Sequence, residues 1–361
     1  MICRLSKEGE LIENISKIIS LRGAVLGVRA NQEKKHWWQS LPFAYQDFKI
    51  SIGSRPVGFR FSQSIVNIEA KFQDTFLLTC GEASDQSLAT TKALAELLER
   101  TAMKEWSTKN PQFKIKSSNG WAAHQSKEDA RLNAIFERVE RDAVLAQWYS
   151  KAPFFQIANE SLPQDVQEWA NAELSQSEFS LLRILISTQG IGPSVTCILM
   201  NEAGFGVTAH AAKSDLKESI ESAIAEACRA AHHYLRRSFW SDSLKLKFSD
   251  HSEKIQPGAH AVYYAYHEPL PLWMFGEEMS WAEANQYWRE KIETFVSHEL
   301  SRFSFQCVVK HPLFIGYATH PEIFEIIWGP TDPAVVSKMT KGRRSSFLNE
   351  RTLNLKPHIV S

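Results

Sequence analysis

The hydrophobic positions of the chain repeat with two different spacings, and together they predict a mixture of helices and strands. Apolar residues that recur every three or four positions are typical of a helix with one buried face, whereas short alternating or continuous apolar runs between turn residues are typical of strands. The helical spacing covers residues 6–21, 86–107, 127–148, 215–236 and 279–300, with a further helix after Pro163. Strands are predicted at 24–29, 64–72, 75–80, 179–187, 193–201, 304–310 and 313–318.

The order of these elements favours an α+β fold, because helices and strands mix without strict strand–helix–strand alternation. Residues 31–55 and 237–278 are aromatic and polar, and are predicted to be irregular. A glycine-rich turn at 201–215 precedes the helix at 215–236, with Ser214 as its expected N-cap. No low-complexity linker interrupts the chain, which predicts one domain over 1–361 with an N-terminal subregion at 1–75 and a basic tail at 338–361.

Composition and charge exclude several classes of protein. The 361 residues carry 41 Lys and Arg against 41 Asp and Glu, so the basic excess typical of nucleic-acid binding is missing. No segment has the roughly 20 uninterrupted apolar residues of a membrane span, and the charged N-terminal stretch is unlike a signal peptide. Five widely spaced cysteines without a CxxC pair predict reduced thiols and a cytoplasmic protein.

An internal duplication is the most informative feature of the sequence. Residues 93–106 read ALAELLERTAMKEW and residues 134–148 read AIFERVERDAVLAQW. Both share Ala, Glu, Glu-Arg and Ala in register, with a Trp four or five residues later. On a helix, positions three or four apart lie on one face, so each copy presents two carboxylates and one guanidinium along a stripe. The small neighbours of the first stripe, Ala89 and Ala93, leave room for a second helix or a ligand.

The chemistry of these stripes suggests a cation site with phosphate contacts. If both stripes faced one cavity, four carboxylates would share it, and they would stay ionised only beside cations. Mg²⁺ suits an all-oxygen site, keeps bound waters and accepts phosphate oxygens, which arginines also bind. The competing interpretation is a set of solvated Glu–Arg salt bridges, each of which contributes only a few tenths of a kcal/mol. A third helix repeats part of the pattern with Ala223, Glu226 and Arg229.

These three segments resemble the motifs of the YcaO family. GEASDQSLATTKALAELLER is similar to the family's first Glu-x-x-Glu-Arg helix, RLNAIFERVERDAVLAQW to its second, and GFGVTAHAAKSDLKESIESAIAEACR to its third element. Order and spacing agree over residues 81–235, and YATHPEIFEIIWG at 317–329 is similar to a late family segment. The resemblance implies a mixed fold of repeated helix–strand elements around a central cleft that binds ATP and Mg²⁺.

The resemblance also implies roles for individual residues. The Mg²⁺ ligands would be Glu96, Glu99, Glu137 and Glu140. The ATP contacts would be Lys7, Asn14, Arg141, Glu226 and Arg229. The family activates peptide backbone amides by phosphorylating the amide oxygen, so the expected activity is azoline-forming cyclodehydration of a ribosomal precursor peptide, with thioamide or amidine formation as alternatives. The expected partners are the precursor peptide, a leader-binding protein and a flavin dehydrogenase, without nucleic acid or membrane.

Three departures from the family pattern favour a rival interpretation. The family's Gly-Lys/Arg-Gly turn is Gly81-Glu82-Ala83 here, and Lys92 replaces a serine of the first helix. The proline-rich tail of azoline-forming members is reduced to Pro357. The rival hypothesis is therefore a non-catalytic scaffold or peptide-binding subunit of a modification complex.

Overall fold

The structure is a computed structural model. It describes residues 43, 45–54, 64–83, 86–111, 118–175, 179–235, 263–265, 268–310, 313–324, 326, 354 and 359. The predicted helix at 6–21 and strand at 24–29 lie outside these residues, as does most of the basic tail. The chain forms two compact units, residues 1–134 with 305–318 and residues 135–304 with 319–361. Compact units need not fold independently, so the single-domain organisation stays a prediction.

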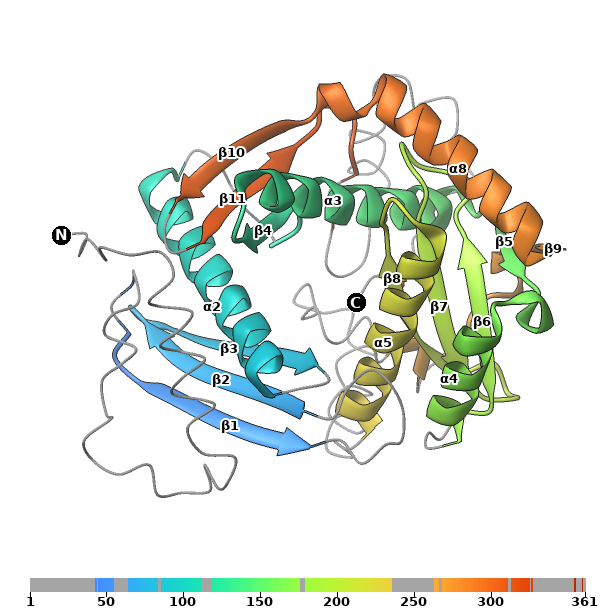
Figure 1. Cartoon of the computed structure of the whole chain (residues 1–361), viewed down its shortest axis with the longest axis horizontal. Helices are drawn as coiled ribbons and strands as arrows, with labels where there is room; N and C mark the ends of the chain where they lie inside the picture. The colour runs from blue at the N-terminus through green and yellow to red at the C-terminus, as the bar shows by residue number, and fades with distance from the viewer. Residues whose placement is uncertain are drawn as a thin grey trace. The chain divides into compact units, whose positions relative to one another are not determined.

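The first unit contains a three-stranded antiparallel sheet covered by one long helix (Figure 1). The strands run in the order β1 (Phe48–Ser54), β2 (Ser64–Phe72) and β3 (Thr75–Ala83), and the helix is α2 (Gln86–Lys109). Alternate residues of each strand are apolar, and Ile50 pairs with Ile68 so that both are directed to one face. The buried side chains of α2 pack on that face and form the core of this unit.

The prediction of an irregular segment at 31–55 is wrong for its last part. Residues 48–54 read FKISIGS and form β1, whose alternating Phe48, Ile50 and Ile52 are half-buried beside the core. Polar residues alternate with these three, and the preceding segment is polar and rich in tryptophan. The period-two pattern of a strand was therefore not recognised in the sequence.

A second small sheet in the first unit joins distant parts of the sequence. Its order is β10 (Ser304–Val309), β11 (Phe314–Thr319) and β4 (Trp121–His124). Trp121 stacks on Tyr317 with ring centroids 5.0 Å apart, and Trp106 of α2 lies edge-on to both rings. The sequence predicts β10 and β11. It does not predict β4, which is short and directly follows a turn-rich segment.

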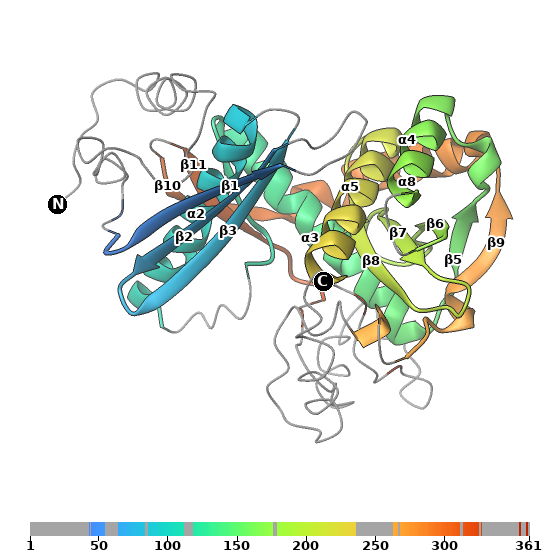
Figure 2. The same cartoon turned by 90° about the horizontal axis from the view of Figure 1, so that it is seen from below.

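The second unit is built on a five-stranded sheet with both faces covered (Figure 2). The order is β8 (Gly206–Ala211), β7 (Val195–Met200), β6 (Leu181–Ile186), β5 (Phe154–Ile157) and β9 (Phe275–Met279). All pairs are antiparallel except β5 with β9. Strands buried on both faces read as continuous apolar runs, which explains the unbroken patterns of β6 and β7.

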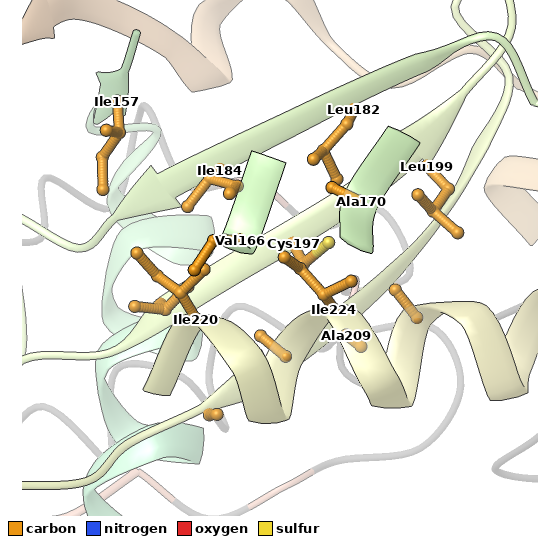
Figure 3. Close-up of a cluster of buried hydrophobic side chains, with 14 of the residues drawn as sticks. Ile157, Val166, Ala170, Leu182, Ile184, Cys197, Leu199, Ala209, Ile220 and Ile224 are labelled. Atoms are coloured by element: carbon orange, nitrogen blue, oxygen red, sulfur yellow. The ribbon is translucent and has the colours of Figure 1, made fainter. Parts of the chain in front are cut away.

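Three helices cover one face of this sheet: α4 (Gln164–Leu174), α5 (Leu216–Leu235) and α8 (Trp281–His298). Figure 3 shows Val166 and Ala170 of α4 and Ile220 and Ile224 of α5 in one cluster with the sheet residues Leu182, Ile184, Cys197 and Leu199. The opposite face packs on α3 (Lys127–Ser150), whose residues from Ile135 onward belong to this unit. The mixed arrangement confirms the α+β fold class.

Three strands of this sheet were not predicted, and two local predictions need correction. The glycine-rich stretch before α5 contains β8, all six residues of which are buried, because its small residues fit between the faces. The residues of β9 lie within the segment predicted to be irregular, and β5 is only four residues long. The N-cap of α5 is Asp215, whose Oδ1 accepts the Glu218 N–H at 3.0 Å, and not Ser214.

Two findings concern the cellular setting predicted from the sequence. The four described cysteines, Cys80, Cys197, Cys228 and Cys307, are free thiols, and two of them are buried in the core. In the part of the chain that the structure describes, no helix is long and apolar enough to cross a membrane.

Candidate active site

The second copy of the repeated motif lies on α3 and brings acidic and basic side chains into a buried environment. Arg141 Nε lies 3.2 Å from Glu140 Oε1, and each of the two side chains is only 13% exposed. Glu137 lies one turn earlier on the same helix and contributes to the electrostatics of both residues. The stripe predicted from sequence is therefore real in this copy, and it is not a solvated salt bridge.

Glu226 of α5 joins this group from a different element. Burial raises the pKa of the Glu140 carboxyl well above its ordinary value; the Arg141 charge opposes that shift, and Glu226 and Glu137 add to it. Burial lowers the pKa of Arg141, but the surrounding carboxylates outweigh burial and hold the guanidinium charged. The charges of three carboxylates thus act on one buried arginine, and the site combines acidic and basic groups from α3 and α5.

Lys213 and His210 complete the surroundings, although the sequence did not single out either residue. Lys213 follows β8 and lowers the pKa of Glu140, and its backbone N–H donates to Ser219 Oγ at 3.0 Å. His210 lies within β8, where burial and then the Arg141 charge lower its pKa to about 3. The imidazole is therefore neutral at physiological pH. Lys213 is a basic residue between a buried strand and a helix N-terminus, a place where anions bind. That position in the sequence could have identified Lys213 as a site residue.

The neutral His210 connects the site to the end of the chain. The backbone carbonyl of Ile359 accepts hydrogen bonds from Thr208 Oγ1 at 2.7 Å and from His210 Nε2 at 3.1 Å. A carbonyl can only accept, so Nε2 carries the proton, and Nδ1 accepts from Thr196 Oγ1 at 3.0 Å. Ile359 is fully buried, and β8 holds it beside the candidate site through these two hydrogen bonds.

Two residues of α3 fix the helix that carries the site. Asp142 accepts the backbone N–H groups of Ile191 and Phe324, and Gln147 Oε1 accepts those of Thr188 and Gln189. Both side chains are completely buried. These contacts fix the rotation and position of α3 in the second unit. They therefore also determine where Glu140 and Arg141 lie.

The first copy of the motif lies in the first unit, on α2. Glu96 Oε2 accepts the Cys80 N–H at 3.0 Å, and the Arg100 guanidinium is paired with Glu96 Oε1. Glu99 follows Glu96 by three residues and is half-buried. The small residues Ala89 and Ala93 face β3, because a Cβ on Gly81 would meet Ala89 O and Ala93 N. They make room for a strand, and not for a second helix as expected.

The remaining predicted site residues are placed as follows. Arg229 lies three residues after Glu226 on α5 and is half-buried. Lys7 and Asn14 lie outside the described residues. The two copies of the motif fall in different units, so the common cavity for Glu96, Glu99, Glu137 and Glu140 stays a prediction.

The donor set of the second unit fits a magnesium–nucleotide by its chemistry. In the described parts of the chain, no three His, Cys, Asp or Glu side chains form a ready-made metal cluster. Mg²⁺ does not need such a cluster, because it usually binds one or two carboxylates together with waters and phosphate oxygens. Glu140 and the neighbouring half-buried Glu137 and Glu226 would supply the carboxylates, and the Arg141 and Lys213 cations suit phosphate.

Comparison with known proteins agrees with this chemistry. The family described as "YcaO cyclodehydratase, ATP- and Mg2+-binding" matches residues 106–302. A search of curated proteins gives no significant match. Among solved structures, a YcaO protein from Methanopyrus kandleri bound with AMPPCP and Mg²⁺ is similar with a TM-score of 0.50 and 11% identity, over 76% of this chain and 84% of that chain. A heterocyclase in complex with substrate and cofactor has a TM-score of 0.55 and 14% identity, over 92% of this chain and 58% of that chain.

Proposed function

The chain belongs to the YcaO family, an ATP- and Mg²⁺-binding family, and on that basis we propose that it activates backbone amides of a ribosomally made precursor peptide. The observation that carries the proposal is the group of Glu137, Glu140 and Glu226 on two helices, whose charges all act on the buried Arg141. In such a site ATP supplies the phosphoryl group that turns the amide oxygen into a good leaving group, and Mg²⁺ offsets the charge.

Residues of the chain would bind and orient rather than react. We propose that Glu137 and Glu140 hold Mg²⁺, with Arg141 and Lys213 on phosphate oxygens. Glu96 and Glu99 stay the further ligands that the family resemblance implies. Charged contacts of this type contribute to phosphoryl transfer by positioning and by electrostatic stabilisation. Burial and the Arg141 charge keep the His210 imidazole unprotonated, so this residue adds no positive charge to the group.

Azoline-forming cyclodehydration is the leading product class, with thioamide or amidine formation as alternatives that use the same activation. Each alternative differs only in the nucleophile that attacks the amide carbon. The precursor peptide, a leader-binding protein and a flavin dehydrogenase remain the proposed partners. The solved heterocyclase binds a substrate, which supports a peptide ligand for a chain of the same fold.

The test is phosphate release from ATP in the presence of the cognate peptide and partner, combined with peptide mass spectrometry. Cyclodehydration predicts one phosphate released and the loss of one water from the peptide for each ring formed. Sulfur incorporation without ring formation would identify the thioamide alternative. Absence of both phosphate release and any mass change would contradict the enzymatic proposal.

A non-catalytic member of the family is the second candidate, and the first unit supplies the observation that favours it. Lys92, which stands where the family has serine, donates to the Glu82 carbonyl at 3.0 Å, and Glu96 is bonded to the backbone of β3. These contacts involve Glu96, which the resemblance assigns to Mg²⁺, and two of the positions that depart from the family pattern. A protein that binds the peptide tightly, but neither binds nor hydrolyses ATP, would support this candidate.

A further inference from the structure

A short connection in the second unit carries a basic residue into the candidate site. β8 ends at Ala211 and α5 begins at Leu216, so residues 212–215 form the β8–α5 connection. Ala212 and Leu216 are both buried, and Lys213 between them is half-buried. The connection therefore leaves the core and returns to it within a few residues, which limits where its backbone can run.

Ser219, in the second turn of α5, makes the first contact that holds this backbone. Its Oγ donates to the Asp215 carbonyl at 2.8 Å and accepts the Lys213 N–H at 3.0 Å. One hydroxyl can do both, because it has a single proton and two lone pairs. The Ser219 side chain is completely buried, so the Lys213 N–H is bonded to a group that water does not reach.

Trp288 of α8 makes the second contact, from 74 positions further along the chain. Its Nε1–H donates to the Ser214 carbonyl at 3.3 Å. The Trp288 side chain is only 1% exposed and belongs to the core that α4, α5 and α8 form with the sheet. A buried indole N–H usually has an acceptor, and here that acceptor is the residue next to Lys213. Two helices thus fix the Lys213 N–H and the following carbonyl.

The charge of Lys213 acts on the acidic and basic group of α3. It lowers the pKa of Glu140, whose carboxylate is paired with Arg141. A lysine ammonium ends a flexible four-carbon stem, and holding it in one place costs rotamer entropy. A fixed backbone removes part of that cost in advance, because fewer positions of the ammonium remain to be lost when it binds an anion.

From these contacts we infer that Ser219 and Trp288 are positioning residues that hold the backbone of Lys213 so that its ammonium binds a phosphate of the nucleotide. The inference rests on the proposed function for the phosphate ligand, whereas the hold on the Lys213 backbone rests on the two hydrogen bonds alone. Neither positioning side chain touches the nucleotide in this account, and both act through Lys213.

A positioning role and a merely structural role differ in one measurable way. Residues that act on a ligand through Lys213 lose their effect on binding once Lys213 is removed, whereas a structural effect is the same in both backgrounds. Lys217 supplies the matched control for the loss of a lysine charge. It lies four positions later, and its Nζ is bonded to Asp165 Oδ2 of α4 at 2.7 Å.

The experiment is a calorimetric titration of single and double variants with Mg²⁺·AMPPCP. Lys213→Met should weaken binding about tenfold, and Lys217→Met by less than about twofold. Ser219→Ala and Trp288→Phe, which remove the acceptor and the donor, should each weaken it at least about threefold when Lys213 is present. In the Lys213→Met background each should change it by less than about 1.5-fold.

The pattern of these affinities decides the inference. It is overturned if Ser219→Ala or Trp288→Phe weakens binding equally in the two backgrounds, or leaves binding unchanged while Lys213 is present. It is also overturned if Lys213→Met binds as tightly as Lys217→Met, because Lys213 then makes no contact of its own with phosphate.

A second measurement follows Lys213 in the protein without nucleotide. Its amine is acylated with an N-hydroxysuccinimide ester, and peptide mass spectrometry gives the rate relative to the exposed Lys127. Ser219→Ala and Trp288→Phe should each raise this ratio at least about twofold, because a released backbone exposes the half-buried amine. An unchanged ratio overturns the hold on Lys213. If the wild type binds no Mg²⁺·AMPPCP, the proposed function fails, and the acylation ratio still decides whether the two residues position Lys213.

Discussion

The carboxylate of Asp142 accepts the backbone N–H of Phe324 at 2.9 Å, across 182 positions of sequence. Its second oxygen accepts the N–H of Ile191 at 3.0 Å, so one buried side chain joins three segments. Asp142 directly follows Glu140 and Arg141. The contacts that fold the second unit therefore also position the charged residues of the candidate site.

Asp142→Asn should destabilise the protein, because the amide replaces one acceptor by a donor that faces a backbone N–H. One buried N–H then loses its partner, which costs about 1–3 kcal/mol. Thermal unfolding should show a Tm lower by roughly 2–8 °C. Glu277→Gln makes the same kind of change at an exposed position of β9 and should leave the Tm within about 1 °C. Equal Tm values for the two variants would contradict the role given to Asp142.

Gly81→Ala should destabilise the first unit through a steric clash between β3 and α2. A methyl group at Gly81 would meet Ala89 O and would lie 2.5 Å from Ala93 N, both of which are helix backbone atoms. Overpacking of this kind typically costs about 1–3 kcal/mol. Gly53→Ala on β1 is the matched control, because nothing lies within 4 Å of its Cβ position. Urea unfolding should separate the two variants, and a Gly81→Ala midpoint equal to that of Gly53→Ala would rule out the clash.

His210 should make stability depend on pH on the acidic side of neutrality. Burial lowers its pKa in the folded protein to about 3, whereas an exposed histidine titrates near 6.5. As the pH falls below about 6.5 the unfolded chain gains a proton that the folded protein does not, so stability is present above that pH and is lost below it. For this group the loss between pH 7 and pH 5 is about 2 kcal/mol.

The measurement compares urea midpoints of the wild type and His210→Gln at pH 7 and pH 5. The wild-type midpoint should fall further than that of the variant, since glutamine cannot titrate. If both proteins lose stability equally over this range, His210 is not the group responsible.

Much of the fold could be predicted because its long elements have strong periodic patterns. The helices α2, α3, α5 and α8 lie within a few residues of the predicted ranges, and so do the strands β6 and β7. The strands that were missed give weaker signals. β4 and β5 have only four residues each, and β8 directly follows a glycine-containing turn. The alternation of β1 is hidden among polar residues.

The site could be predicted only in part, because sequence spacing shows which residues share a helix face but not what that face meets. The stripe with Glu140 and Arg141 is buried among charges, as the repeat suggested. The matching stripe with Glu96 and Arg100 meets the edge of β3. Lys213 and His210 come from elements far along the chain, and only the folded structure brings them to the group around Arg141.

The most direct test of the central claim is calorimetric titration of the protein with AMPPCP, with and without Mg²⁺. We predict binding that requires Mg²⁺ and that weakens at least tenfold in Glu140→Gln, because this variant removes a buried carboxylate beside Arg141. Glu128→Gln lies on the same helix, in an exposed pair with Arg131, and should bind as the wild type does. No Mg²⁺-dependent binding, or equal affinity in both variants, would contradict the claim.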